Sequence, residues 1–212
     1  MKRLENCKRI GILGGTFNPV HVGHLFMAEY AREAIGLDMV IFIPTGVPYM
    51  KSAKEILPGS VRKERLDLSI SDNPYFVSSD IEIKREGNTY TYETLKALKK
   101  LYPQAELYFL VGADCLFSIE KWVEPQQIFE HCILVAANRN HTADEALREK
   151  KVYLEKAFHA NVILLDFPTV DISSTVRRKR VQEGKSIRYM VHDAILAYIQ
   201  KNGLYQKEWT EE

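Results

Sequence analysis

The sequence predicts an α/β fold in which helices cover both faces of a mostly parallel sheet. Short apolar runs of strand length alternate with helix-length stretches along the whole chain. The apolar runs are nearly continuous, as in strands that are buried on both faces. No repeat, low-complexity tract or linker interrupts the alternation. We therefore expect one doubly wound, Rossmann-like domain over residues 1–212.

Composition narrows the functional classes. The chain has 212 residues, enough for a full hydrophobic core, and a formal net charge of +1. This balance gives no overall basic field for nucleic acid. No apolar run is long enough to span a membrane, and residues 1–9 are polar and basic, unlike a signal peptide. Three cysteines without C-x-x-C spacing indicate reduced thiols in a cytoplasmic protein.

The first half of the chain begins with an apolar run that we expect to be a central strand. Gly36 is placed to end the helix that follows it. Ser60 is placed to cap a later helix, as a simple cap because Lys63 stands where a capping box needs Glu or Gln. In order, the expected elements are strand 9–13, helix 25–35, strand 40–44, loop 45–58, helix 60–70 and strand 76–84.

The second half continues the alternation. Leu95, Leu98 and Leu101 recur at helical spacing, and Gly203 is placed to stop the last helix. The expected elements are helix 91–101, strand 107–111, short helical segments 115–119 and 125–129, strand 132–136, helix 142–157, strand 161–165, and helices 174–182 and 191–199.

A glycine-histidine stretch joins the first strand to the first helix. It runs Gly14-Gly15-Thr16-Phe17-Asn18-Pro19-Val20-His21-Val22-Gly23-His24. A helix N-terminus behind glycines favours a phosphate, although the spacing is neither G-x-G-x-x-G nor a P-loop. His21 and His24, three apart, share a helix face and suit charge stabilisation better than metal binding, which lacks a third ligand. Ordinary capping or packing histidines remain an alternative.

Two motifs carry a family resemblance. The stretch above resembles the G-G-T/S-F-D-P-x-H-x-G-H signature of the nucleotidylyltransferase superfamily. Ile172-Ser173-Ser174-Thr175-Val176-Arg177-Arg178 resembles its I-S-S-T-x-x-R signature. Together they are most similar to bacterial nicotinate-nucleotide adenylyltransferases. The resemblance implies a nucleotidyltransferase of NAD biosynthesis that joins ATP and nicotinate mononucleotide to give deamido-NAD and pyrophosphate.

The resemblance also implies roles at the ATP end of the site. His21, His24 and Arg178 would be catalytic; Arg177 stands where the family usually has an apolar residue, and register favours Arg178. The implied ATP-binding residues are Gly14, Gly15, Thr16, Phe17, Gly112, Asp114, Arg139, Ser173, Ser174 and Thr175. Plain alternatives stay open: a helix cap for the serine motif and for Asp114, and a surface arginine for Arg139.

Asn18, Lys51, Thr91 and Trp122 are the residues that the resemblance assigns to nicotinate mononucleotide. Trp122 would stack on the pyridine ring, and Thr91 would help present helix amides to its carboxylate. Asn18 replaces the usual Asp, which weakens any role of this position as a charged metal contact. The alternatives are a helix cap for Thr91, a packing aromatic for Trp122 and an ordinary loop lysine for Lys51.

Other functions stay open at this point. One alternative is a related adenylyltransferase that uses nicotinamide mononucleotide or phosphopantetheine. Another is a protein of the same fold that binds a nucleotide without catalysis. A nucleic-acid module is disfavoured by the balanced charge. Mg²⁺ is implied by ATP and is expected to be carried by the phosphates, with no protein ligand named. A homo-oligomer is left open, and no membrane partner is expected.

Overall fold

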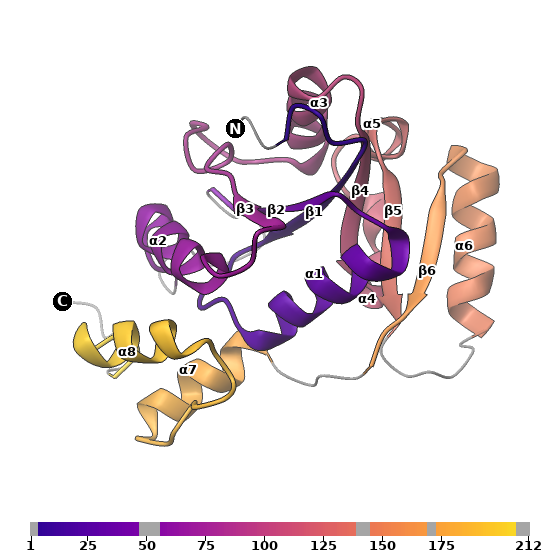
Figure 1. Ribbon diagram of the computed structural model, residues 1–212. Coiled ribbons are helices and arrows are strands. Elements are labelled where there is room, and N and C mark those ends of the chain that lie inside the picture. Colours follow the sequence, from indigo (N-terminus) through magenta and orange to yellow (C-terminus); the bar gives the residue numbers. More distant parts are fainter. Residues whose placement is uncertain (1–3, 47–55, 139–144, 169–172, 207–212) are drawn as a thin grey trace.

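The computed structural model describes residues 4–46, 56–138, 145–168 and 173–206. Its strands form one six-stranded, all-parallel sheet in the order β3-β2-β1-β4-β5-β6 (Figure 1). The predicted doubly wound α/β fold is confirmed. The strands are β1 (Arg9–Gly15), β2 (Met39–Pro44), β3 (Phe76–Ser78), β4 (Glu106–Gly112), β5 (Ile133–Asn138) and β6 (Val162–Asp166).

Helices cover both faces of this sheet, and the core is split between them. On one face, α1, α2 and α8 pack with residues such as Leu13 and Phe42. On the other, α3, α4, α5 and α6 pack with residues such as Ile12 and Ile41. The helices are α1 (Val22–Ile35), α2 (Gly59–Ile70), α3 (Thr91–Leu101), α4 (Ala113–Leu116), α5 (Pro125–His131), α6 (Glu145–Phe158), α7 (Ser174–Gln182) and α8 (Asp193–Lys201), with a 3₁₀ turn η2 (Ile119–Lys121).

The strand order reverses its direction of growth between β1 and β4. The chain builds β1, β2 and β3 outward to one edge, then returns to place β4 beside β1 and continues to β6 (Figure 1). In open parallel sheets, ligands bind beyond the carboxyl ends of the strands at this switch. The ends of β1 and β4, at Gly15 and Gly112, are therefore where a site is expected.

The first helix starts three residues before the predicted position. His21 is the N-cap residue of α1, so His24 lies inside the first turn. Gly36 ends α1 as predicted, with φ of 71°, and its N–H donates to the Glu33 carbonyl. Glycine is favoured at this position because it adopts positive φ without steric cost.

Two local predictions are wrong. The strand predicted over 76–84 ends at Ser78, because the chain leaves the sheet edge and turns, with the N–H of Lys84 bonded to the carbonyl of Asp80. The alternating isoleucines belong to that turn and not to a strand. Ser60 does not cap α2: the N-cap is Pro58, whose carbonyl accepts from the N–H of Arg62.

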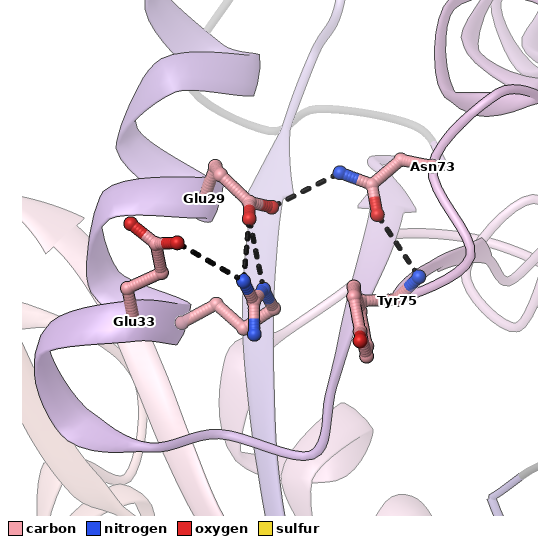
Figure 2. Close-up of polar contacts among 5 residues, drawn as sticks. Glu29, Glu33, Asn73 and Tyr75 are labelled. Atoms are coloured by element: carbon pink, nitrogen blue, oxygen red, sulfur yellow. Dashed lines mark hydrogen bonds and ion pairs between the residues drawn. The ribbon is translucent and has the colours of Figure 1, made fainter.

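A polar cluster fastens α1 to the segment that precedes β3. Glu29 accepts two bonds from Arg32, at 2.6 and 3.0 Å, and one from Asn73 at 3.0 Å (Figure 2). The guanidinium of Arg32 also lies 4.2 Å from the centre of the Tyr75 ring. The hydrogen bond from Arg32 lowers the pKa of the Glu29 carboxyl. Because the Tyr75 carbonyl accepts from the N–H of Val40 in β2, the cluster helps to place the edge of the sheet.

In the part of the chain that the structure describes, no helix is long and apolar enough to cross a membrane.

Candidate active site

A cavity of about 850 Å³ opens at the carboxyl ends of β1 and β4. It lies at the switch in strand order, where both faces of the sheet contribute side chains. Its lining brings together most of the residues singled out from the sequence: Gly14, Gly15, Thr16, Asn18, His21, His24, Thr91, Gly112, Trp122, Ser173, Ser174, Thr175 and Arg178. Residues separated by up to 164 positions along the chain therefore share one cavity.

The two motif histidines lie face to face. The ring centres of His21 and His24 are 3.5 Å apart, and the planes differ by 24°. The main-chain N–H of His21 donates to Nδ1 of His24 over 3.2 Å. When Nδ1 accepts, a neutral imidazole carries its proton on Nε2. His24 therefore presents an Nε2–H donor, of the kind that stabilises negative charge on a phosphate.

Phe17 supports this pair from within the core. Its side chain is buried, and its ring meets that of His24 edge-on at 5.0 Å between centres. The backbone at Phe17 has φ of 47°, a region that non-glycine residues rarely adopt. The Phe17 side chain is not part of the cavity lining; it packs against the ring of His24 from the core.

The turn Asn18–Pro19 links the first motif to the serine motif. The Asn18 carbonyl accepts from Nη1 of Arg178 at 2.9 Å, and the Pro19 carbonyl accepts from the Ser174 hydroxyl at 2.9 Å. Ser173 caps α7, because its hydroxyl accepts from the N–H of Val176. The serine motif therefore both caps α7 and lines the cavity.

The two adjacent arginines of α7 differ in environment. Arg177 is fully buried and donates to the carbonyls of Met190 and Ser173, and burial lowers its pKa to about 10. Arg178 is half-buried and lines the cavity. Arg178 therefore reaches the cavity whereas Arg177 packs in the interior, and the catalytic role of Arg178 stays a prediction.

Thr91 and Trp122 enter the cavity from the opposite face of the sheet to the histidines. Thr91 is the first residue of α3, and the side chain of its N-cap, Tyr90, makes no capping bond. Trp122 follows η2, and its ring packs edge-on against Phe109 with centres 6.3 Å apart. Trp122 therefore packs on the core with one edge while it lines the cavity.

Asp114 lies in a different environment from the lining residues. It is exposed, it is absent from the cavity lining, and the N-cap of α4 is Gly112. The helix-cap alternative for Asp114 is therefore wrong, and its contact with ATP stays a prediction. Lys51 and Arg139, which were also predicted to bind substrate, lie outside the described residues.

Glu82 lines the cavity and was not predicted from the sequence. Its Oε1 accepts from the Thr94 hydroxyl at 2.8 Å, and burial raises the pKa of its carboxyl. Gly46 passes so close that an added Cβ would lie 2.3 Å from the Glu82 carbonyl oxygen. Only glycine fits there. Glu82 thus joins the chain after β2 to the first turns of α3.

A buried arginine that was not predicted from the sequence bonds to the chain segments that line the cavity. Arg62, with 2% of its surface exposed, donates to the carbonyls of Leu57, Thr16, Thr45 and Gly46 at 2.6–3.2 Å. Burial lowers the pKa of its guanidinium. These bonds tie the chain that leaves β1 to the chain that leaves β2. An arginine on the same helix face as Leu66 and Ile70 is the sequence signal for such a role.

Comparison with known proteins identifies the family. A sequence model described as cytidylyltransferase-like matches residues 12–180. A protein of Lachnoclostridium phytofermentans, named a probable nicotinate-nucleotide adenylyltransferase, is 43% identical over 198 residues, which are 93% of this chain and 99% of that one. This chain belongs to the cytidylyltransferase-like family and, within it, to the nicotinate-nucleotide adenylyltransferases. A Desulfitobacterium hafniense protein of the same name is 46% identical over 94% of this chain and 96% of its own.

Solved structures show that the family fold extends beyond close relatives. The nicotinic acid mononucleotide adenylyltransferase of Plasmodium falciparum complexed with NaAD superposes with a TM-score of 0.78 at 23% identity. The alignment covers 96% of this chain and 100% of that one. The same enzyme complexed with APC gives a TM-score of 0.76 at 22% identity. At these identities the likeness concerns the fold.

Proposed function

We propose that this chain transfers the adenylyl group of ATP to nicotinate mononucleotide, giving deamido-NAD and pyrophosphate in NAD biosynthesis. One observation carries the proposal. A single cavity holds phosphate-binding groups from α1 and α7 on one side, and an aromatic ring and a helix N-terminus from the other face of the sheet. This arrangement suits two nucleotides that meet at their phosphates, and the family membership supports it.

The reaction needs positioned charge rather than a covalent intermediate. A phosphate oxygen of the mononucleotide attacks the α-phosphorus of ATP in line, a P–O bond forms, and the bond to the β-phosphate oxygen breaks. Negative charge moves onto pyrophosphate. We assign His24 Nε2–H and His21 to the reacting phosphates, and Ser174, Thr175 and Arg178 to the leaving phosphates. Such donors act most strongly where charge develops.

The pyridine ring belongs at the other side of the cavity in this proposal. Trp122 supplies a face for stacking, and α3 directs its first-turn amides at the ring carboxylate. Thr91 stands at that helix start. A carboxylate gains from both the helix dipole and the amide donors, whereas a carboxamide gains less. The proposal therefore predicts a preference for nicotinate over nicotinamide.

Mg²⁺ enters with ATP in this account. Within the described residues, no three metal-ligating side chains form a cluster that would hold an ion. The donors near α1 and α7 are imidazoles, hydroxyls and a guanidinium, which suit phosphate oxygens more than a magnesium ion. When bound on the phosphates, Mg²⁺ neutralises part of their charge; the residues named above orient the phosphates themselves.

The direct test is product identification. The purified chain would be incubated with ATP, Mg²⁺ and nicotinate mononucleotide. The products would be separated by chromatography and identified by mass spectrometry. We expect deamido-NAD and pyrophosphate in equal amounts, and no product when either nucleotide is omitted. AMP or ADP as the main product would contradict adenylyl transfer to this acceptor.

A further inference from the structure

Tyr205, beyond the end of α8, reaches the first motif. Its side chain is buried, with 7% exposed, and its backbone has φ of 63°. The hydroxyl donates to Oδ1 of Asn18 over 2.8 Å and accepts from Nη1 of Arg65. A residue 187 positions away therefore holds the side chain of the residue at the centre of the motif.

Asn18 connects this buried contact to the cavity. Its side chain faces Tyr205 and Arg65, while its main-chain carbonyl accepts from Arg178 Nη1 at 2.9 Å. Arg178 lines the cavity, and Asn18 is itself 3% exposed. The Asn18 side chain is thus anchored to Tyr205 and Arg65, and a shift of the Asn18 backbone on loss of this anchor would displace the carbonyl that accepts from Arg178.

The charge of Arg65 makes the tyrosine hydroxyl important. Arg65 is fully buried, and its acceptors are neutral: the Tyr205 hydroxyl, Asn18 Oδ1 at 3.5 Å and the Val61 carbonyl at 3.3 Å. Its guanidinium also lies 5.6 Å from the centre of the Tyr205 ring. A buried cation with neutral acceptors depends on each of them. Without the hydroxyl, Arg65 is expected to draw the Asn18 side chain toward itself.

We propose that Tyr205 is a positioning residue for Arg178: it fixes the Asn18 side chain, and the Asn18 carbonyl in turn fixes the guanidinium that binds the ATP phosphates. The assignment of Arg178 to phosphate rests on the proposed function. The Tyr205 hydroxyl itself touches no substrate in this account. Its loss should therefore affect ATP binding, and it should do so only while Arg178 is present.

Tyr198 offers a matched control. Its hydroxyl donates to Glu64 Oε2 at 2.8 Å, so it also joins α8 to α2, but it makes no contact with Asn18 in the described structure. Tyr198→Phe and Tyr205→Phe each remove one hydroxyl group that connects the C-terminal part of the chain to α2. A general loosening of α8 against α2 would affect ATP binding equally in both variants.

The test is ATP binding by calorimetry, with Mg²⁺ and without mononucleotide, in a double-mutant cycle. We expect Tyr205→Phe to weaken ATP binding about tenfold, the effect of losing one hydrogen bond to a charged or ordered group. Tyr198→Phe should change it less than about twofold. In an Arg178→Ala background, Tyr205→Phe should add no further loss. An unchanged affinity, or the same loss with and without Arg178, would overturn the proposal.

Two additions keep the test decisive. If Tyr205→Phe does not fold, Asn18→Ala removes the acceptor of the same hydroxyl and keeps the carbonyl; it must show the same coupling to Arg178→Ala, and additivity overturns the proposal. If the wild-type chain binds ATP but makes no dinucleotide, the proposed acceptor is wrong while the Tyr205 test stands. If it does not bind ATP, both proposals fail.

Discussion

The main-chain N–H of His21 donates to Nδ1 of His24 across 3.2 Å. This bond orients the ring of His24, which lines the cavity, and places the proton of a neutral imidazole on Nε2. His24→Asn keeps an acceptor near the position of Nδ1 but loses the distal donor. We expect both His24→Asn and His24→Ala to lower kcat by about 10²–10³-fold, because the donor to transition-state charge is absent.

The two variants separate catalysis from capping. We expect His24→Asn to unfold at nearly the wild-type urea concentration, since the N–H of His21 keeps its partner. His24→Ala should be slightly less stable, because the N–H of His21 loses its side-chain acceptor. Steady-state rates and urea unfolding measure the two effects. A His24→Asn enzyme with near-normal kcat would remove His24 from the mechanism.

The neighbouring arginines of α7 should separate stability from activity. Arg177→Met removes the side-chain donors to the carbonyls of Met190 and Ser173, which keep the main-chain N–H groups of Val22 and residue 177 as donors, and should lower the free energy of unfolding by about 1 kcal/mol. Arg178→Ala should lower kcat/KM by about 10²-fold or more and change stability little. Denaturant unfolding measures the stability of both variants, and initial rates measure their kcat/KM. A large loss of kcat/KM in Arg177→Met with little change in Arg178→Ala would assign the functional role to Arg177.

Trp122 should act on one substrate. If it stacks on the pyridine ring, Trp122→Ala raises the KM for nicotinate mononucleotide far more than the KM for ATP. Trp122→Phe, which keeps an aromatic face and the contact with Phe109, serves as the control. Initial rates over a grid of both substrates separate the two constants. Equal changes in both would favour the packing role.

Glu82 predicts a pH dependence of stability. Burial raises the pKa of its carboxyl in the folded state, so the folded chain holds this proton more tightly than the unfolded chain. The cost of ionising it is absent below the ordinary glutamate pKa of about 4.3 and appears as pH rises through the folded pKa. Glu82→Gln should therefore gain stability relative to wild type as the pH rises to neutrality.

Urea unfolding of both proteins at a series of pH values measures this trend. Glu86→Gln, at an exposed position in the same segment, is the matched control for the removal of one carboxylate. A difference between Glu82→Gln and wild type that is independent of pH would argue against a buried carboxyl with a raised pKa.

The sequence was sufficient for the fold and for the expectation that its two contiguous motifs meet at one place. Apolar runs such as 40–44 identify buried strands, and the strand ends place Gly15 and Gly112 at one edge. The strand predicted over 76–84 ends at Ser78, and Ile81 and Ile83, whose alternation predicted its second half, lie in a turn. Spacing alone does not distinguish an edge strand from a turn that packs one side on the core.

The contacts that support the cavity could not be predicted from local sequence patterns. Tyr205 and Asn18 are 187 positions apart, and Arg62 and Arg65 belong to a class of residue that normally lies at the surface. Their burial depends on which carbonyls and hydroxyls the assembled fold places around them. Such partners come from separate elements, so neither helical periodicity nor motif spacing indicates them.

The central claim is adenylyl transfer to a pyridine mononucleotide, and one measurement tests it most directly. Pyrophosphate release would be followed with ATP and Mg²⁺, and with nicotinate mononucleotide, nicotinamide mononucleotide or phosphopantetheine offered singly. The account predicts rapid release with the nicotinate form, slower release with the nicotinamide form and background release with phosphopantetheine. Equal or faster release with phosphopantetheine, or no release with any of the three, would contradict it.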